Sequence, residues 1–269
     1  MRLFRHLSGR PLKFLNRWLL PVGALLTLTG YLRPWITHKA AGLAILGLDL
    51  GELVKFLHPV QQGDIRLWRE GFYLPLVAVS VSLCMSAFRR DLAGPLADSE
   101  PNHSAGVRGS QPTYGWPFRI GLLLLSFVAA LNLLPPAWTP RLLLAPEYRL
   151  QTAALLACLA LAALSPLAAL LLTPSSLLAS LGKSSENANP RGFLMRTAWS
   201  FSLLRGLFAV GLTGAAIYFP LAQFRWILPT LAELYGRMPD IGYGPALMTV
   251  GLAGLLFHGL SDISALLRE

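Results

Sequence analysis

The sequence predicts an all-α, polytopic membrane protein with six transmembrane helices and additional interfacial helices. Of its 269 residues, 54% are hydrophobic and only 13% are charged, whereas soluble domains carry about 25% charged residues. The apolar residues are gathered in runs that reach or approach the roughly 20 helical residues needed to cross a bilayer. Because backbone groups in lipid must be hydrogen-bonded within the chain, we expect these runs to be helices. The runs are residues 18–36, 72–88, 118–138, 150–173, 198–219 and 245–267.

A basic stretch precedes the first apolar run, as it does in a secretory signal. No pair of small residues at the spacing of a cleavage site follows this run directly, so we expect the first helix to be retained. The residues Arg33, Pro34 and Trp35 are typical of an anchor at the membrane interface.

Basic residues fall mainly on one side of the membrane when the runs are threaded in order from a cytoplasmic N-terminus. The inner segments then hold 13 Lys and Arg against five Asp and Glu, and the outer segments hold nine against seven. Cytoplasmic segments are the ones enriched in Lys and Arg, so the sequence predicts cytoplasmic N- and C-termini in the plasma membrane. This topology explains the net charge of +10, and no nucleic-acid-binding motif accompanies that charge.

Residues 1–17 form a basic segment ahead of the single transmembrane domain that we expect over residues 18–269. Projected as a helix, its apolar and basic side chains fall on opposite arcs. Such a helix lies on the inner leaflet with its basic face toward anionic headgroups. A basic flank that only sets the orientation of the chain is the alternative interpretation.

An outer interfacial helix is predicted over about residues 39–58. This segment is apolar, but Asp49, Glu52 and Lys55 lie near its middle. Each charge would cost about 2.5–3.5 kcal/mol at the centre of a membrane span, so the segment is placed at the outer surface. Glu52 and Lys55 have the spacing of an ion pair along a helix.

Two flexible cytoplasmic loops are expected, at residues 91–116 and 174–196. Both are rich in Pro, Gly, Ser and Asn and contain stretches without an apolar period.

Ionisable residues within the last two runs are the strongest candidates for a functional site. Arg205 lies in run 198–219, and His258 and Asp262 lie in run 245–267. Arg205 and Asp262 are about 12 Å and 9 Å from the cytoplasmic ends of their antiparallel runs, so they share one level of the membrane. The sequence therefore predicts an Arg205–Asp262 pair with His258 one turn deeper, and Asn132 of run 118–138 is a possible additional member.

Small residues follow the same faces of these two runs, and in lipid they let helix backbones approach closely. We expect them to form a packing seam between the two helices. Two interpretations of the paired charges stay open: they fix helix register, or they line a polar path for an ion, a proton or an anionic solute. The seam residues are Gly206, Ala209 and Thr213 in one run and Gly251, Gly254 and Ser261 in the other.

No recognisable catalytic motif supports an enzyme. The sequence has no Gly-x-Ser-x-Gly elbow, His-Glu-x-x-His pair, P-loop or dinucleotide fingerprint. Of the five histidines only His258 lies within a run, which leaves too few ligands for a transmembrane bis-histidine haem. We expect no metal and no cofactor, although an unfamiliar membrane enzyme acting on lipid is an alternative.

The number of runs, the amphipathic start and the helical outer segment before the last run are similar to the membrane subunits of export-type ABC transporters. This likeness implies a permease-like, transport-related subunit that works with a separate ATPase, because no P-loop is present. The long outer segment 37–71 departs from that architecture. Other membrane subunits or further copies of this chain are expected partners in the bilayer. A non-catalytic structural or assembly subunit of a larger membrane complex is the alternative function.

Overall fold

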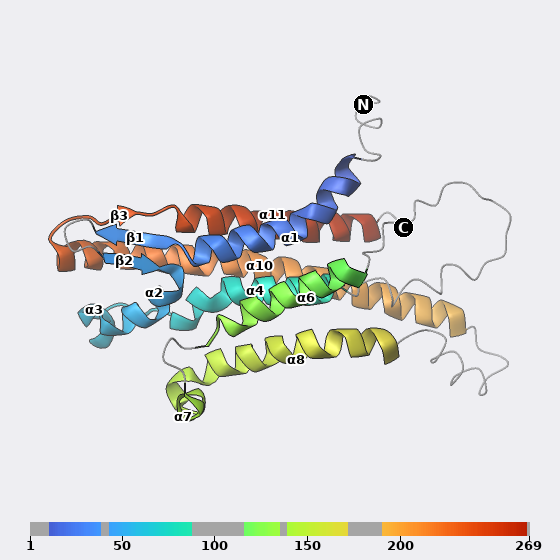
Figure 1. Cartoon of the computed structure of the whole chain (residues 1–269), viewed down its shortest axis with the longest axis horizontal. Helices are drawn as coiled ribbons and strands as arrows, with labels where there is room; N and C mark the ends of the chain where they lie inside the picture. The colour runs from blue at the N-terminus through green and yellow to red at the C-terminus, as the bar shows by residue number, and fades with distance from the viewer. Residues whose placement is uncertain (1–10, 39–42, 88–115, 135–138, 172–189, 268–269) are drawn as a thin grey trace.

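Long helices that lie side by side with similar directions dominate the structure (Figure 1). The computed structural model describes residues 11–38, 43–87, 116–134, 139–171 and 190–267, and the prediction of a mostly helical protein is confirmed. The first turns of α1 bend away from the rest of that helix, which contains Pro21, a residue that interrupts the helical hydrogen-bond ladder. The long helices are α1 (Pro11–Tyr31), α4 (Leu74–Ala87), α6 (Trp116–Leu131), α8 (Arg149–Leu171), α10 (Pro190–Tyr235) and α11 (Gly244–Leu266).

Four helical segments within the described residues are long and apolar enough to cross a membrane. They are Arg69–Ala87, Pro146–Pro166, Ser202–Tyr235 and Gly244–Leu266. Two further apolar helices, Trp18–Tyr31 and Trp116–Leu131, are shorter. By length and composition these segments are compatible with a membrane protein.

Helix α4 forms the centre of the bundle. It contacts each of the other five long helices, and 72% of its apolar window is buried, against 22–28% for the other three candidate spans. This buried share shows that other parts of the protein surround α4. Within this core, Ser126 of α6 hydrogen-bonds both Ser80 and Cys84 of α4, each over 2.9 Å. In lipid such contacts between polar side chains help to hold helices together.

Helices α1 and α11 pack with their backbones in close contact, because glycines face each other along the interface. A Cβ atom on Gly23 would lie 2.8 Å from the carbonyl oxygen of Gly251, and one on Gly244 would lie 2.7 Å from that of Gly30. Real Cβ contacts are essentially never this short. A side chain is therefore excluded at these glycine positions.

At one end of the bundle a small region of strands and short helices takes the place of long helices. We call it the outer cap, after the side of the membrane predicted from the sequence, and it comprises residues 34–38, 43–73 and 240–241. Its sheet has the order β2-β1-β3 with antiparallel pairs, formed by β1 (Pro34–His38), β2 (Leu43–Leu46) and β3 (Asp240–Ile241). The other elements are α2 (Gly47–Leu53), η3 (Val54–Phe56), α3 (His58–Gln61) and η4 (Arg69–Tyr73).

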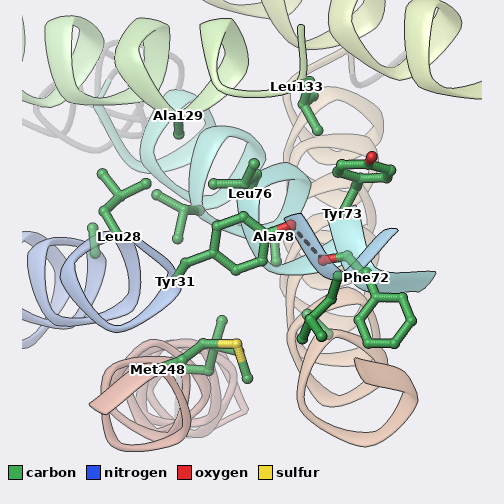
Figure 2. Packing of buried hydrophobic residues seen from close by; sticks show 14 of the residues in the cluster. Leu28, Tyr31, Phe72, Tyr73, Leu76, Ala78, Ala129, Leu133 and Met248 are labelled. Atoms are coloured by element: carbon green, nitrogen blue, oxygen red, sulfur yellow. Dashed lines mark hydrogen bonds between the residues drawn. The ribbon is translucent and has the colours of Figure 1, made fainter. Parts of the chain in front are cut away.

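The interior of the outer cap is built around Trp35 and Tyr31, which are both fully buried. The Trp35 indole donates a hydrogen bond to the Gly30 carbonyl oxygen (3.2 Å), and its ring meets Phe224 of α10 edge-on with centroids 5.2 Å apart. The Tyr31 hydroxyl donates to the Phe72 carbonyl oxygen over 2.9 Å, as Figure 2 shows. The cap is thereby packed onto the ends of α1, α4 and α10.

Several predictions about the outer side were wrong. The first helix ends at Tyr31, because a residue before proline disfavours the helical conformation, and Trp35-Ile36-Thr37 are residues that favour strands. The chain is therefore not all-α, and Trp35 is a core residue rather than an interfacial anchor. The predicted helix over 39–58 is replaced by β2, α2 and η3, and residues 39–42 lie outside the described part of the chain.

Predictions for the segments expected on the cytoplasmic side were also partly wrong. Helix α10 begins at Pro190, so the predicted loop 174–196 is wrong over residues 190–196. At 46 residues α10 is about 69 Å long, and it continues through Pro220 and Pro229 into the segment that flanks the cap. Residues 11–17 belong to α1. The predicted loop 91–116 falls outside the described residues except for Trp116, as do residues 1–10. The start of α1 and the end of α11 lie at the same end of the bundle (Figure 1).

The remaining short elements are α7 (Pro140–Leu143) and η5 (Pro146–Tyr148), which precede α8.

Candidate functional site

A cavity lined by both polar and apolar side chains lies toward the end of the bundle opposite the outer cap. We call it the inner cavity, after the side of the membrane predicted from the sequence. Four helices surround it: α1, α4, α10 and α11. Its polar lining consists of Ser82 and Ser86 from α4, Ser202 and Arg205 from α10, and His258 and Asp262 from α11. The structure therefore brings together three of the residues that the sequence singled out.

The inner cavity has a volume of about 30 Å³. A water molecule needs about 10–15 Å³ counted in this way, so the cavity has room for about two waters. A pocket for an organic solute is at least ten times larger. The size of the cavity therefore suits water, a proton or a small ion.

His258 is buried and both of its ring nitrogens face oxygen atoms. Nδ1 lies 3.1 Å from the backbone carbonyl oxygen of Asn16 and 3.0 Å from the Asn16 side-chain oxygen. Nε2 lies 3.5 Å from the Asp262 carboxylate, one helical turn away. The Asn16 carbonyl can only accept a hydrogen bond, so Nδ1 carries a proton and donates it. Helix α1 thus fixes the orientation of the imidazole ring.

Arg205 reaches from α10 to the end of α4. Its Nη1 donates a hydrogen bond to the Met85 carbonyl oxygen over 3.3 Å. Met85 lies on α4, so this hydrogen bond from a charged guanidinium to a backbone carbonyl joins α10 to α4. The direct Arg205–Asp262 contact stays a prediction, although both residues line the same cavity.

Asn132 is placed elsewhere. It lies just beyond the end of α6, and its side chain donates a hydrogen bond to the Val128 carbonyl oxygen of its own chain segment over 2.8 Å. Helix α6 ends at the end of the bundle that carries the outer cap (Figure 1). The structure does not bring Asn132 to the inner cavity.

The predicted seam residues divide between two partners. Gly206 and Ala209 line the inner cavity, and Gly206 faces the Ile263 side chain of α11. Gly251 and Gly254 face α1 instead of α10. The two small-residue faces thus do not form one shared seam. The sequence shows which face of a helix carries small residues, but it does not show which helix packs against that face.

The other two seam residues make less specific contributions. Thr213 of α10 is buried, and its hydroxyl donates to the Ala209 carbonyl oxygen of the same helix over 2.7 Å. Ser261 is half-buried on α11. Val210 of α10 packs against Gly259 of α11, a contact that was not predicted from the sequence. A Cβ added at Gly259 would lie 2.9 Å from the Val210 side chain.

Sequence reasoning also missed Asn16, Ser82 and Ser86. The signal for the serines was their position at one end of an otherwise apolar run, and for Asn16 its position immediately before the first run. Both signals are common in membrane proteins. They become informative only once the helices that surround His258 are known.

A second group of charges, the outer ionic cluster, joins the outer cap to the segment before α8. Lys55 pairs with Glu52 over 2.5 Å and with Glu147, which confirms the predicted Glu52–Lys55 pair. Arg69 also pairs with Glu147 over 3.2 Å, and both cations lie over the Tyr148 ring. Such a network of partly exposed charges holds two surface segments in register.

The environment of Lys55 keeps this cluster charged. Burial lowers the pKa of Lys55, but the hydrogen bonds that its ammonium donates to Glu147, Glu52 and Tyr148 outweigh that effect, so the pKa is raised above its usual value. A raised lysine pKa contributes stability at any pH below about 10.4, and that contribution is lost only as the pH rises above this value. The cluster is therefore a permanent link at neutral pH and not a switch.

Among the described residues no group of three or more His, Cys, Asp or Glu is placed to hold a metal ion. Comparisons with protein-family models, with curated proteins and with solved structures gave no match. The function is therefore argued from the inner cavity itself.

Proposed function

We propose that this protein is a six-helix, multi-pass subunit of the plasma membrane that takes part in transport. The single observation behind this proposal is that Arg205, His258 and Asp262 line one cavity within a bundle of apolar helices. Ionisable groups are costly inside a membrane and usually mark ion or substrate pathways. Of the possible cargoes, a small ion or a proton fits the volume of the cavity best.

Six spans are supported by the way successive long helices alternate in direction. In this proposal α1 and α6 also cross the membrane, although their apolar stretches are shorter than those of the other four. Local thinning of the bilayer accommodates a short span at modest cost. An even number of spans places both termini on one side, and the charge asymmetry of the sequence makes this the cytoplasmic side. A permease-like role with a separate ATPase as partner belongs to the same proposal.

Ion flux into liposomes tests this function. The full chain, together with any chains that co-purify after mild solubilisation, is reconstituted and given a proton or alkali-cation gradient. We expect wild-type protein to conduct, and the variants Arg205→Gln and Asp262→Asn to lower the flux about tenfold. Arg225→Gln and Asp240→Asn are matched controls, because both residues are exposed and neither lines the cavity. Flux equal to that of protein-free liposomes, or equal loss in all four variants, would contradict the proposal.

The second candidate is a structural or assembly subunit of a larger membrane complex. The observation that favours it is the small buried share of α8, 22% of its apolar window, which leaves most of that helix to lipid or to another subunit. The chains that co-purify distinguish the two candidates. A nucleotide-binding chain supports the transport subunit, whereas respiratory or photosynthetic subunits support the assembly role.

A further inference from the structure

The oxygen atoms around His258 favour one more proton than a neutral imidazole carries. Three oxygen atoms face its two ring nitrogens: two belong to Asn16 and the third is Oδ2 of Asp262. The Asn16 carbonyl fixes a proton on Nδ1 whichever way the side-chain amide is turned. A neutral ring would then present the lone pair of Nε2 to a carboxylate oxygen at 3.5 Å.

Two lone pairs that face each other in a weakly polar interior repel, whereas one proton between them converts the repulsion into an ion pair. We infer that His258 and Asp262 form a proton-binding site, in which Nε2 of His258 binds a proton and the resulting N–H donates a hydrogen bond to the Asp262 carboxylate. On taking up the proton the ring becomes an imidazolium, with Nδ1–H on Asn16 and Nε2–H on Asp262. The role of this site in transport rests on the proposed function, but its proton occupancy does not.

Some of the groups around the site stabilise the protonated imidazole of His258, and one destabilises it. The Asp262 carboxylate stabilises the imidazolium from the same helix, and the Asn16 carbonyl stabilises it from α1. The Arg205 guanidinium, which lines the same cavity from α10, opposes a second positive charge. On α4 the described polar groups at the cavity are the neutral hydroxyls of Ser82 and Ser86. Among these described groups Asp262 supplies the carboxylate, so replacing it is expected to release the proton.

Nitrogen NMR on protein labelled with ¹⁵N at histidine measures this proton directly. The sample is the full chain in lipid nanodiscs, in a variant whose other four histidines are replaced by glutamine, so that one imidazole signal remains. A histidine in water has a pKa of about 6.5, so about one-tenth of it is protonated at both nitrogens at pH 7.5. We expect more than half of His258 to be doubly protonated at that pH, at least fivefold more. A bare Nε2 at pH 7.5 would overturn the inference.

A second variant separates the role of Asp262 from a general effect of burial. In Asp262→Asn the doubly protonated fraction at pH 7.5 is expected to fall at least fivefold, whereas the exposed Asp240→Asn leaves it unchanged. An unchanged spectrum in Asp262→Asn would show that the carboxylate does not hold the proton and would equally overturn the inference. If Asp262→Asn does not fold, the single-histidine protein still decides the question.

The NMR result and the flux result are independent. If His258 is doubly protonated but the protein conducts no ions, the proposed function is contradicted and the proton site is supported. If the protein conducts ions but His258 is neutral, the proton site is contradicted and the proposed function is supported.

Discussion

Replacing Gly251 by valine is expected to disrupt the packing of α1 against α11 and to destabilise the protein by about 3 kcal/mol or more. A Cβ at this position would lie 2.5 Å from the carbonyl oxygen of Gly23 and 2.5 Å from the Thr27 hydroxyl. The carbonyl belongs to the backbone of α1, so the helices must separate to make room. The free energy of unfolding in detergent, followed by circular dichroism, measures the effect.

The matched control is Gly214→Ala on α10, where an added Cβ meets nothing within 4 Å. Alanine has a higher helix propensity than glycine by about 1 kcal/mol, so this variant should be at least as stable as the wild type. Similar stabilities for Gly251→Val and Gly214→Ala would contradict the close contact between α1 and α11.

Replacing Trp35 by alanine is expected to cost about 3–5 kcal/mol, the range for a fully buried aromatic residue. The indole has no exposed surface, contacts Phe224, and donates a hydrogen bond to Gly30. Its loss leaves a void where α1, β1 and α10 meet, and the Gly30 carbonyl oxygen keeps only the longer hydrogen bond from the Arg33 backbone N–H among those described, 3.4 Å. Thermal unfolding, compared at equal lipid and detergent content, measures this cost.

Trp226→Ala provides the comparison, because Trp226 is 55% exposed near the same end of α10. Exposed substitutions usually change stability by about 0.5 kcal/mol or less. If Trp35→Ala were as mild as Trp226→Ala, Trp35 would be an interfacial anchor, as its sequence context first indicated, and the outer cap would lack its central contact.

The features that could be predicted from the sequence are those set by long apolar runs and by charges within them. Long runs need no tertiary information to become helices in lipid, and α4, α8 and α11 lie where three such runs were found. The convergence of Arg205, His258 and Asp262 followed from antiparallel threading alone, which fixes depth along a helix.

The outer cap could not be predicted, because its strands are two to five residues long and their alternation is too short to be a reliable pattern. Trp35 and Ile36 become core residues only through contacts with segments far along the chain, such as Phe224 and Ile241. The continuation of α10 through Pro220 and Pro229 was missed because proline usually ends a helix.

The partner of a small-residue face was also beyond prediction. Gly251 and Gly254 have the spacing of a packing face, but that spacing fits any neighbouring helix equally well. The structure pairs them with α1, while Gly206 faces Ile263 on another part of α11.

The central claim is that Arg205 of α10 and Asp262 of α11 act together at one inner cavity, and a double-mutant cycle on stability tests it most directly. Residues of one polar network show coupling energies of about 0.5–3 kcal/mol. The change in unfolding free energy of the double variant, Arg205→Gln with Asp262→Asn, should therefore differ from the sum of the two single changes by at least about 0.5 kcal/mol. The cycle between Arg225→Gln and Asp262→Asn, which involves an exposed arginine of the same helix, should be additive. Additivity of the Arg205 and Asp262 cycle to within about 0.3 kcal/mol would contradict the claim.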